Sequence, residues 1–282
     1  MSLTEREKTV FLNIKKWEDQ LYDYEPNDFQ LVYDKYLEKT FSLLPEEIQN
    51  KFFTVLDQWL FHLHAIIQGS QLQMDAKERI LAAGRVFLPE IETIDDLKSL
   101  NIDQLQYIAE QQISRHRLYS LAQGGISGTG EVLLLGSDIP AMAVINLRVI
   151  QLIAMTYGVE INNPFEMMTS LKIFHAATSP RRMQKSGWEQ LLRELNEHED
   201  YYFYQGQEEI TDISWMEQPL THMLKAFLIL LLRKKSMRGV PILSMAIGAG
   251  ANYQLTRKVT DFAHNYYQWR YLLSKEENLY EY

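Results

Sequence analysis

Seven histidines are the residues of this sequence best suited to proton transfer or metal binding, because cysteine is absent. Two imidazoles on one helix share a metal ion when they lie four residues apart and so point the same way. His62 and His64 are two residues apart, which turns them about 200° from each other on a helix. The other five are isolated in sequence: His116, His175, His198, His222 and His264. We therefore expect no metal site.

No motif for an activated nucleophile or for a phosphate-binding loop is present. The sequence contains no Gly-x-Ser-x-Gly, no His-Glu-x-x-His and no kinase signature, and the glycines near residue 124 precede no Lys-Ser or Lys-Thr pair. Without cysteine, thiolate nucleophiles and disulfides are excluded. Glu131 and Glu166 are single acids, whereas glycoside hydrolysis needs two carboxylates. The sequence thus predicts no enzyme, no catalytic residue and no cofactor.

The net charge of −9 is concentrated in the first part of the chain. Residues 1–110 hold 11 Lys+Arg and 20 Asp+Glu, a net of −9, while residues 111–282 hold 17 of each, a net of zero. Nucleic-acid binding needs a basic face, so we do not expect a nucleic-acid partner. The N-terminus has no apolar segment typical of a signal peptide, which favours a cytoplasmic location.

The composition predicts an all-α, multi-helix bundle. Hydrophobic residues make up 46% of the chain and charged residues 23%, with only 8 Pro and 13 Gly. We expect an acidic N-terminal helical region (1–86), a polar connection (87–102) and a helical domain (103–282). Within them, periodic apolar residues predict helices over 3–24, 29–42, 45–67, 75–86, 164–176, 186–198, 217–237 and 252–274, and one that starts near 103.

The least charged stretch of the chain runs from Ala122 to Gly158. It is expected to form a buried, Gly-rich helical hairpin at the centre of the bundle, with Ser137 or Asp138 as the N-cap of its second helix and Pro140 in the first turn. Small residues let helix backbones approach closely. The glycines expected to do so are Gly124, Gly128, Gly136, Gly248 and Gly250.

Arg148 argues against a membrane span in this stretch. A helix over 139–157 would be about 28 Å long, which is enough to cross a bilayer. A charge at its centre costs roughly 2.5–3.5 kcal/mol, so the pattern favours helices buried in protein, and attachment to a membrane surface remains an alternative. A buried Arg148 needs an acid or carbonyl groups as partners. The possible ion pairs are Arg148 with Asp261 or Glu166, and Asp138 with Arg257 or Arg270.

A basic group follows the apolar helix expected over 217–237. Positive charge suits the C-terminal end of a helix, and it also suits contact with anionic lipid headgroups. Both interpretations stay open. The group consists of Arg233, Lys234, Lys235 and Arg238.

Several short motifs, in their order and spacing, resemble the EcsC protein family of bacteria. They are Gly124-x-x-x-Gly128, GSDIP from Gly136 to Pro140, Leu147-Arg148, Tyr157-Gly158, Pro241, Gly248-Ala249-x-x-Asn252, and AHNYYQWR from Ala263 to Arg270. The resemblance covers roughly residues 75–275. It implies a mostly helical protein without assigned catalytic activity. It also directs attention to a polar set of motif residues: Asp138, Arg148, Asn252, Arg257 and Arg270.

The name-giving member of that family is encoded beside an ABC transporter linked to secretion and competence in Gram-positive bacteria. The resemblance therefore implies a non-enzymatic, membrane-proximal accessory protein with a protein partner, such as a transporter or a secretion or protease system. Such a protein would be cytoplasmic or peripheral at the inner face of the cell membrane. The alternative is a module that binds a lipid or another apolar molecule in a cavity lined by Met142, Leu152, Met155 and Met245.

Overall fold

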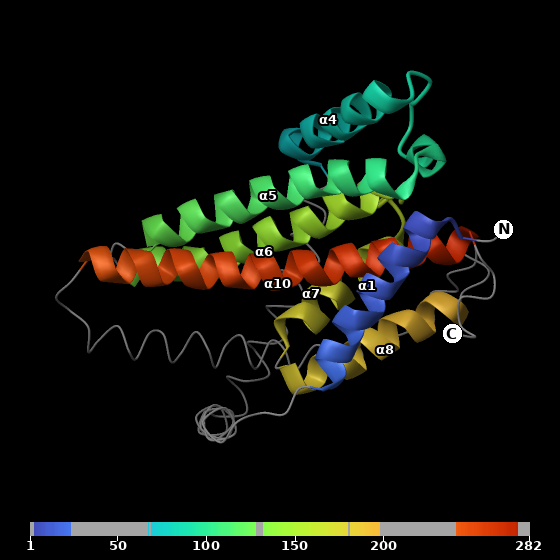
Figure 1. Cartoon of the computed structure of the whole chain (residues 1–282). Coiled ribbons are helices and arrows are strands. Elements are labelled where there is room, and N and C mark those ends of the chain that lie inside the picture. The colour runs from blue at the N-terminus through green and yellow to red at the C-terminus, as the bar shows by residue number, and fades with distance from the viewer. Residues whose placement is uncertain are drawn as a thin grey trace.

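The protein is an all-α bundle in the part of the chain that the structure, a computed structural model, describes: residues 3–23, 67, 69–127, 132–179, 181–197 and 241–275. Apart from the 3-10 helix η1 (Asp95–Ser99), all regular elements of these residues are α-helices, as predicted (Figure 1). They are α1 (Glu5–Tyr22), α4 (Gln71–Phe87), α5 (Ile102–Ser127), α6 (Val132–Thr156), α7 (Pro164–Thr178), α8 (Arg181–Glu197) and α10 (Pro241–Lys275). The helices expected over 29–42, 217–237 and most of 45–67 lie outside the described residues, as does the segment 199–216.

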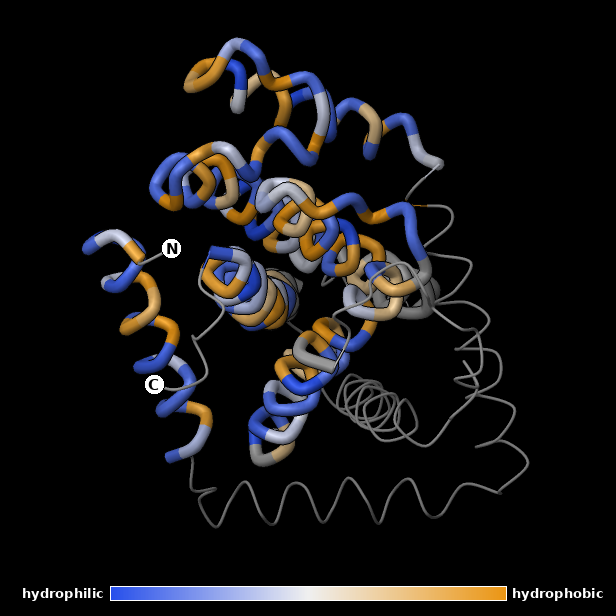
Figure 2. Tube along the Cα trace, turned by 90° about the vertical axis from the view of Figure 1, so that its right-hand side faces the viewer, coloured by the Kyte–Doolittle hydropathy of each residue, from blue (hydrophilic) through white to orange (hydrophobic). Residues whose placement is uncertain are grey.

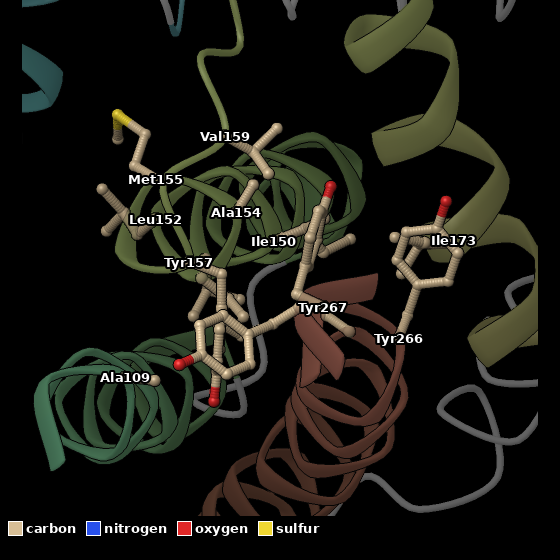
Figure 3. Close-up of a cluster of buried hydrophobic side chains, with 14 of the residues drawn as sticks. Ala109, Ile150, Leu152, Ala154, Met155, Tyr157, Val159, Ile173, Tyr266 and Tyr267 are labelled. Atoms are coloured by element: carbon tan, nitrogen blue, oxygen red, sulfur yellow. The ribbon is translucent and has the colours of Figure 1, made fainter. Parts of the chain in front are cut away.

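Helix α10 is the axis of the fold. It packs against α1, α5, α6 and α7, and Figure 2 shows it near the centre of the molecule, with α1 on one side and α5 and α6 on another. The core between these helices is rich in aromatic side chains. Figure 3 shows part of this core, with Tyr157 at the end of α6, Tyr267 of α10 and Ala109 of α5. All three residues are almost fully buried.

Local sequence signals set several helix starts correctly. Thr4 accepts a hydrogen bond from the backbone N–H of Glu7, and the Glu7 carboxylate accepts one from the backbone N–H of Thr4, which together form a capping box. Asn163 caps α7 through the backbone N–H of Glu166, and Pro164 occupies the first turn. These signals act within one helical turn, so they can be read without knowledge of the tertiary fold.

Four predicted helix starts lie too late in the sequence, by four residues for α4, five for α8 and more for α6 and α10. Helix α6 starts at Val132, so Ser137 and Asp138 lie inside it and are not its N-cap, and Pro140 lies in the helix and not in its first turn. An internal proline costs roughly 3 kcal/mol, which the packing of α6 along α5 offsets. Helix α10 begins at Pro241, and the small apolar residues 241–251 continue directly into the helix predicted over 252–274.

The described part of the acidic N-terminal region packs into the same hydrophobic core as the other helices. Trp17 of α1 makes edge contacts with Trp188 of α8 and Phe262 of α10, with ring centroids 5.0 and 5.3 Å apart. The buried Glu18 carboxylate accepts a hydrogen bond from the Trp188 indole N–H at 3.0 Å. The polar connection 87–102 also packs inward, since Ile91, Ile94 and Leu97 have no exposed surface. These contacts join regions that the sequence separates.

Gly158 ends α6, and the backbone conformation at this position requires a glycine. Its φ is +76°, and the backbone N–H groups of Gly158 and Val159 donate to the carbonyls of Met155 and Ala154, as in a Schellman motif. A Cβ here would also collide with the side chain of Lys98. Of the glycines predicted for close packing, Gly124 is buried. A Cβ at Gly250 would meet no atom within 4 Å, which argues against close packing there. Gly128 lies outside the described residues, and the packing at Gly136 and Gly248 is not described.

We expect Gly158→Ala to lower the free energy of unfolding by about 1–2 kcal/mol, because a Cβ disfavours the left-handed conformation. Urea denaturation measures this loss. Gly250→Ala is the control: it lies in α10 with open space around it, so the higher helix propensity of alanine should leave stability unchanged or raise it by up to about 1 kcal/mol. Equal losses in the two variants would contradict the role of the Gly158 conformation.

Candidate functional site

Arg148 binds a carbonyl group and not an acid. Its Nη2 donates to the backbone carbonyl of Leu72 in α4 at 2.6 Å. Its Nε is buried and has no hydrogen-bond partner in the described part of the chain. The predicted ion pairs of Arg148 with Glu166 or Asp261 are wrong, because these acids bind other arginines. Of the two kinds of partner expected for Arg148, an acid or carbonyl groups, the structure shows a carbonyl group.

Glu166 of α7 forms a buried, two-point ion pair with Arg270 of α10. The Arg270 Nη1 and Nη2 atoms donate to the Glu166 Oε2 and Oε1 atoms at 2.9 and 2.6 Å. Only 2% of the Glu166 side chain and 16% of the Arg270 side chain are exposed. Parallel N–H···O bonds of this kind fix position and orientation together. The pair therefore fastens α7 to α10.

Asp261 of α10 pairs across the fold with Arg117 of α5 at 2.6 Å and lies 3.8 Å from the Nε of Arg257, one turn before it on α10. The acid is partly exposed, and so are both arginines. The predicted pairs of Asp138 with Arg257 or Arg270 lie outside what is described, since nothing is described of the Asp138 side chain.

The predicted motif residue Asn252 belongs to a buried hydroxyl network that the sequence did not indicate. The Ser120 hydroxyl of α5 donates to the backbone carbonyl of Asn252 in α10 at 2.8 Å, and it accepts a hydrogen bond from the Thr256 hydroxyl at 2.7 Å. Asn252 and Thr256 lie four residues apart and so share a helix face. The four-residue spacing of Asn252 and Thr256 was the signal available in the sequence, but it does not identify Ser120 of α5 as their partner.

The sequence also did not indicate a second buried contact, between Tyr157 and His264. The Tyr157 hydroxyl and the His264 Nε2 are joined by a hydrogen bond of 2.8 Å. Burial lowers the pKa of His264 to about 4 and raises the pKa of Tyr157 well above its usual value. Both groups are therefore neutral near pH 7, and their hydrogen bond joins the end of α6 to α10. Both residues fall within the sequence motifs, yet the motifs did not mark them as partners.

The predicted polar set is thus distributed over several contacts. Arg148 binds α4, Asn252 lies against α5, and Arg270 binds α7. In the described residues no group of three or more His, Cys, Asp or Glu side chains could hold a metal ion. The contacts tie helices together, and none of them presents a charged side chain beside a free nucleophile.

A different feature emerges at one end of the bundle, where α5 ends and α6 and α10 begin. Figure 1 shows these ends side by side on the left, projecting past α1, α4, α7 and α8. Residues 118–127 and 241–256 contain no charged residue, and 132–147 contain only Asp138. Leu118 is 63% exposed, Tyr119 51% and Leu121 40%. We call these three segments the low-charge end.

Arginines border the low-charge end on all three helices. Going from this end toward the middle of the bundle, the first charged residue on α5 is Arg117 and the first on α10 is Arg257. On α6, Arg148 is the first charged residue after Asp138. At 1.5 Å per residue, the low-charge segments extend about 15 Å beyond Arg117 and about 24 Å beyond Arg148 and Arg257. Asp261 binds both Arg117 and Arg257, which places these two at the same level.

None of the described helices combines the length and the apolar character that crossing a membrane requires. The basic group Arg233, Lys234, Lys235 and Arg238 lies outside the described residues.

Comparisons with known proteins extend the sequence resemblance. Residues 8–272 match the EcsC protein family, so the match begins far before residue 75 and takes in most of α1. The chain is also similar to the uncharacterized protein YdbA of Bacillus subtilis (strain 168), with 24% identity over 283 residues that cover 96% of each protein. No solved structure matches the chain.

Proposed function

This chain belongs to the EcsC protein family, and from that premise we propose that it is a non-enzymatic accessory protein that attaches peripherally to a membrane through its low-charge end. A protein of the membrane is its expected partner. Components of an ABC transporter, or of a secretion or protease system, are the candidates that the family resemblance suggests. The inner face of the cell membrane is the corresponding location.

The low-charge end and the arginines that border it are the observation that supports this proposal. The hydrocarbon core of a bilayer is about 30 Å thick, so an end of about 15–24 Å enters one leaflet without needing to cross both. Arg117, Arg148 and Arg257 would then lie near the headgroups, where a basic residue gains about 1 kcal/mol from anionic lipid. The basic residues Arg233, Lys234, Lys235 and Arg238 precede the start of α10 by three to eight residues in sequence.

The arrangement of the ionisable core residues favours a non-enzymatic role. Glu166 and Arg270 satisfy each other, and Tyr157 and His264 are neutral and hydrogen-bonded to each other. A general acid or base needs access to a substrate proton, whereas these groups are occupied by contacts between helices.

The alternative, a cavity for an apolar molecule, has less support. Leu152 and Met155, which were expected to line it, are part of the packed hydrophobic core, and Met142 is buried beside Ser120. The side chain of Met245 is not described. Packing of these residues favours contact with a partner or a membrane over enclosure of a ligand.

Flotation with lipid vesicles tests the attachment. The protein should float with phosphatidylcholine vesicles and more strongly when phosphatidylglycerol is added. Leu118→Glu/Leu121→Glu should lower the partition coefficient by about 100-fold, because burial of two leucines contributes about 3 kcal/mol or more.

Leu12→Glu is the matched control for this experiment, because Leu12 on α1 is 64% exposed and lies away from the low-charge end. This variant should float like the unchanged protein. The proposal fails if the unchanged protein floats with neither vesicle, or if Leu12→Glu reduces flotation as much as the double variant does.

A further inference from the structure

The last turn of α4 leaves apolar side chains exposed to solvent. Val86 is 80% exposed and Phe87 37%, and Tyr107 of α5 is 56% exposed. The rings of Phe87 and Tyr107 meet edge to face with their centroids 6.0 Å apart, so the two helices share one surface. Single exposed apolar residues are normal on a protein, whereas an apolar patch with a polar rim is typical of a contact surface. We call Ala83, Val86, Phe87 and Tyr107 the α4–α5 face.

Three residues of this face form a helix stripe. Ala83, Val86 and Phe87 have the i, i+3, i+4 spacing that places side chains on one side of a helix. A different side of the same turn is filled by η1, because a Cβ at Gly84 would lie 2.7 Å from the side chain of Leu97. An apolar helix stripe is normally buried against another element. Here the stripe ends in a valine that is mostly exposed.

Acidic residues flank the α4–α5 face. Residues 85–110 hold six Asp+Glu and two Lys+Arg, a net of −4. Glu110 is exposed and lies one turn after Tyr107 on α5. Glu90 is also exposed and follows Phe87 by three residues, in the tight turn after α4. Neither acid forms an ion pair within the described part of the chain.

The basic residues of this region serve other contacts. Lys98 forms an ion pair with Asp95 on η1, and Arg6 of α1 forms one with Asp103. Arg85 lies on the side of α4 away from Phe87, and its Nε donates to a carbonyl of the following loop at 2.8 Å. The negative charges of Glu90 and Glu110 therefore remain beside the apolar side chains.

This combination selects the chemistry of the occupant. Anionic lipid and nucleic acid are both repelled by the two acids. A second copy of this chain, joined through a two-fold axis, would bring the same acids together. A basic amphipathic helix fits, because its apolar stripe covers Val86 and Tyr107 while its Lys and Arg side chains meet Glu90 and Glu110. These cations also bind favourably over the face of a tyrosine ring.

We propose that the α4–α5 face binds a basic amphipathic helix of a partner protein. Cytoplasmic segments of membrane proteins carry an excess of Lys and Arg, so a membrane protein can supply such a helix. The choice of a membrane protein as its source rests on the proposed function. Figure 1 shows α5 running from the loop after α4, at the upper right, to the low-charge end on the left, so attachment to a bilayer leaves the α4–α5 face free.

Fluorescence anisotropy with a labelled peptide, in which Leu and Lys follow the amphipathic spacing of a helix, tests the face in buffer without vesicles. The unchanged protein should bind this peptide saturably, and Val86→Ser/Tyr107→Ser should weaken binding about tenfold, because apolar contact area is lost. The variant should fold normally, since both side chains are largely exposed. Leu12→Ser removes an equally exposed apolar side chain of α1 and should bind like the unchanged protein.

The acids are tested with the same peptide. Glu90→Gln/Glu110→Gln should weaken binding about threefold or more at low salt and reduce its dependence on salt, because attraction between exposed charges is screened by ions. Asp19→Asn/Asp23→Asn is the matched control, since it removes two exposed acids of α1 and the same amount of net charge. This control should bind the peptide like the unchanged protein.

Several results would overturn the proposal. They are no binding of the peptide, equal binding by Val86→Ser/Tyr107→Ser, and equal binding of a peptide with Glu in place of Lys. Self-association that this variant abolishes, measured by sedimentation, would identify a second copy as the occupant, and reduced flotation of the variant would identify lipid. Peptide binding is measured without vesicles and flotation without peptide, so the α4–α5 face and attachment through the low-charge end are judged separately.

Discussion

Glu166→Leu is expected to lower the free energy of unfolding by about 3–5 kcal/mol, because it leaves the charge of the largely buried Arg270 without its carboxylate. The loss combines the cost of a desolvated cation with the loss of two charge-assisted hydrogen bonds. Urea denaturation followed by circular dichroism measures it, provided that the slope with denaturant stays unchanged.

The double variant Glu166→Leu/Arg270→Met tests whether the loss of stability comes from the unpaired charge of Arg270. Replacing both members of a buried ion pair by apolar residues of similar volume is often close to neutral. The double variant should therefore recover most of the stability lost in Glu166→Leu. If the single replacement costs less than about 1 kcal/mol, or if the double variant is less stable than the single one, the pair does not fasten α7 to α10 as argued.

Acid should destabilise the protein before its carboxylates titrate. Burial lowers the pKa of His116 and of His264 to about 4, whereas an unfolded chain has a histidine pKa near 6.5. Between these values the unfolded state binds more protons than the folded state, so the free energy of unfolding falls as the pH falls. The stabilisation is complete above about pH 6.5 and decreases by about 2 kcal/mol per histidine by pH 5.

Denaturation curves from pH 7.5 to pH 5 measure this loss, and His116→Gln/His264→Gln serves as the comparison. Glutamine does not titrate, so the stability of this variant should change little over the same range. A flat profile for the unchanged protein, or an equally steep one for the variant, would contradict the assignment of these two histidines as buried and neutral.

The candidate site could be predicted only in part. The sequence identified Arg148 as a charge that needs a buried partner, but it offered Glu166 or Asp261 to Arg148, whereas Glu166 binds Arg270. A helix period gives the face on which a residue lies and not the helix that meets this face. For the same reason, His264 appeared isolated, although the fold brings the Tyr157 hydroxyl within hydrogen-bond distance of it.

The sequence by itself determined the features that depend on a few neighbouring residues or on composition. The all-α class, the capping of α1 by Thr4 and of α7 by Asn163, and the low charge between Arg117 and Glu160 all belong to this group. Caps and periodicity act within one or two turns, so they are the same in any fold that contains the helix.

Only the tertiary structure decided how far α6 and α10 extend, that α1 joins the common core, and that Glu166 binds Arg270. Each of these depends on contacts between residues far apart in the chain. The packing of α6 outweighed the local preference of Pro140 to start a helix, because packing stabilises the helix along its whole length.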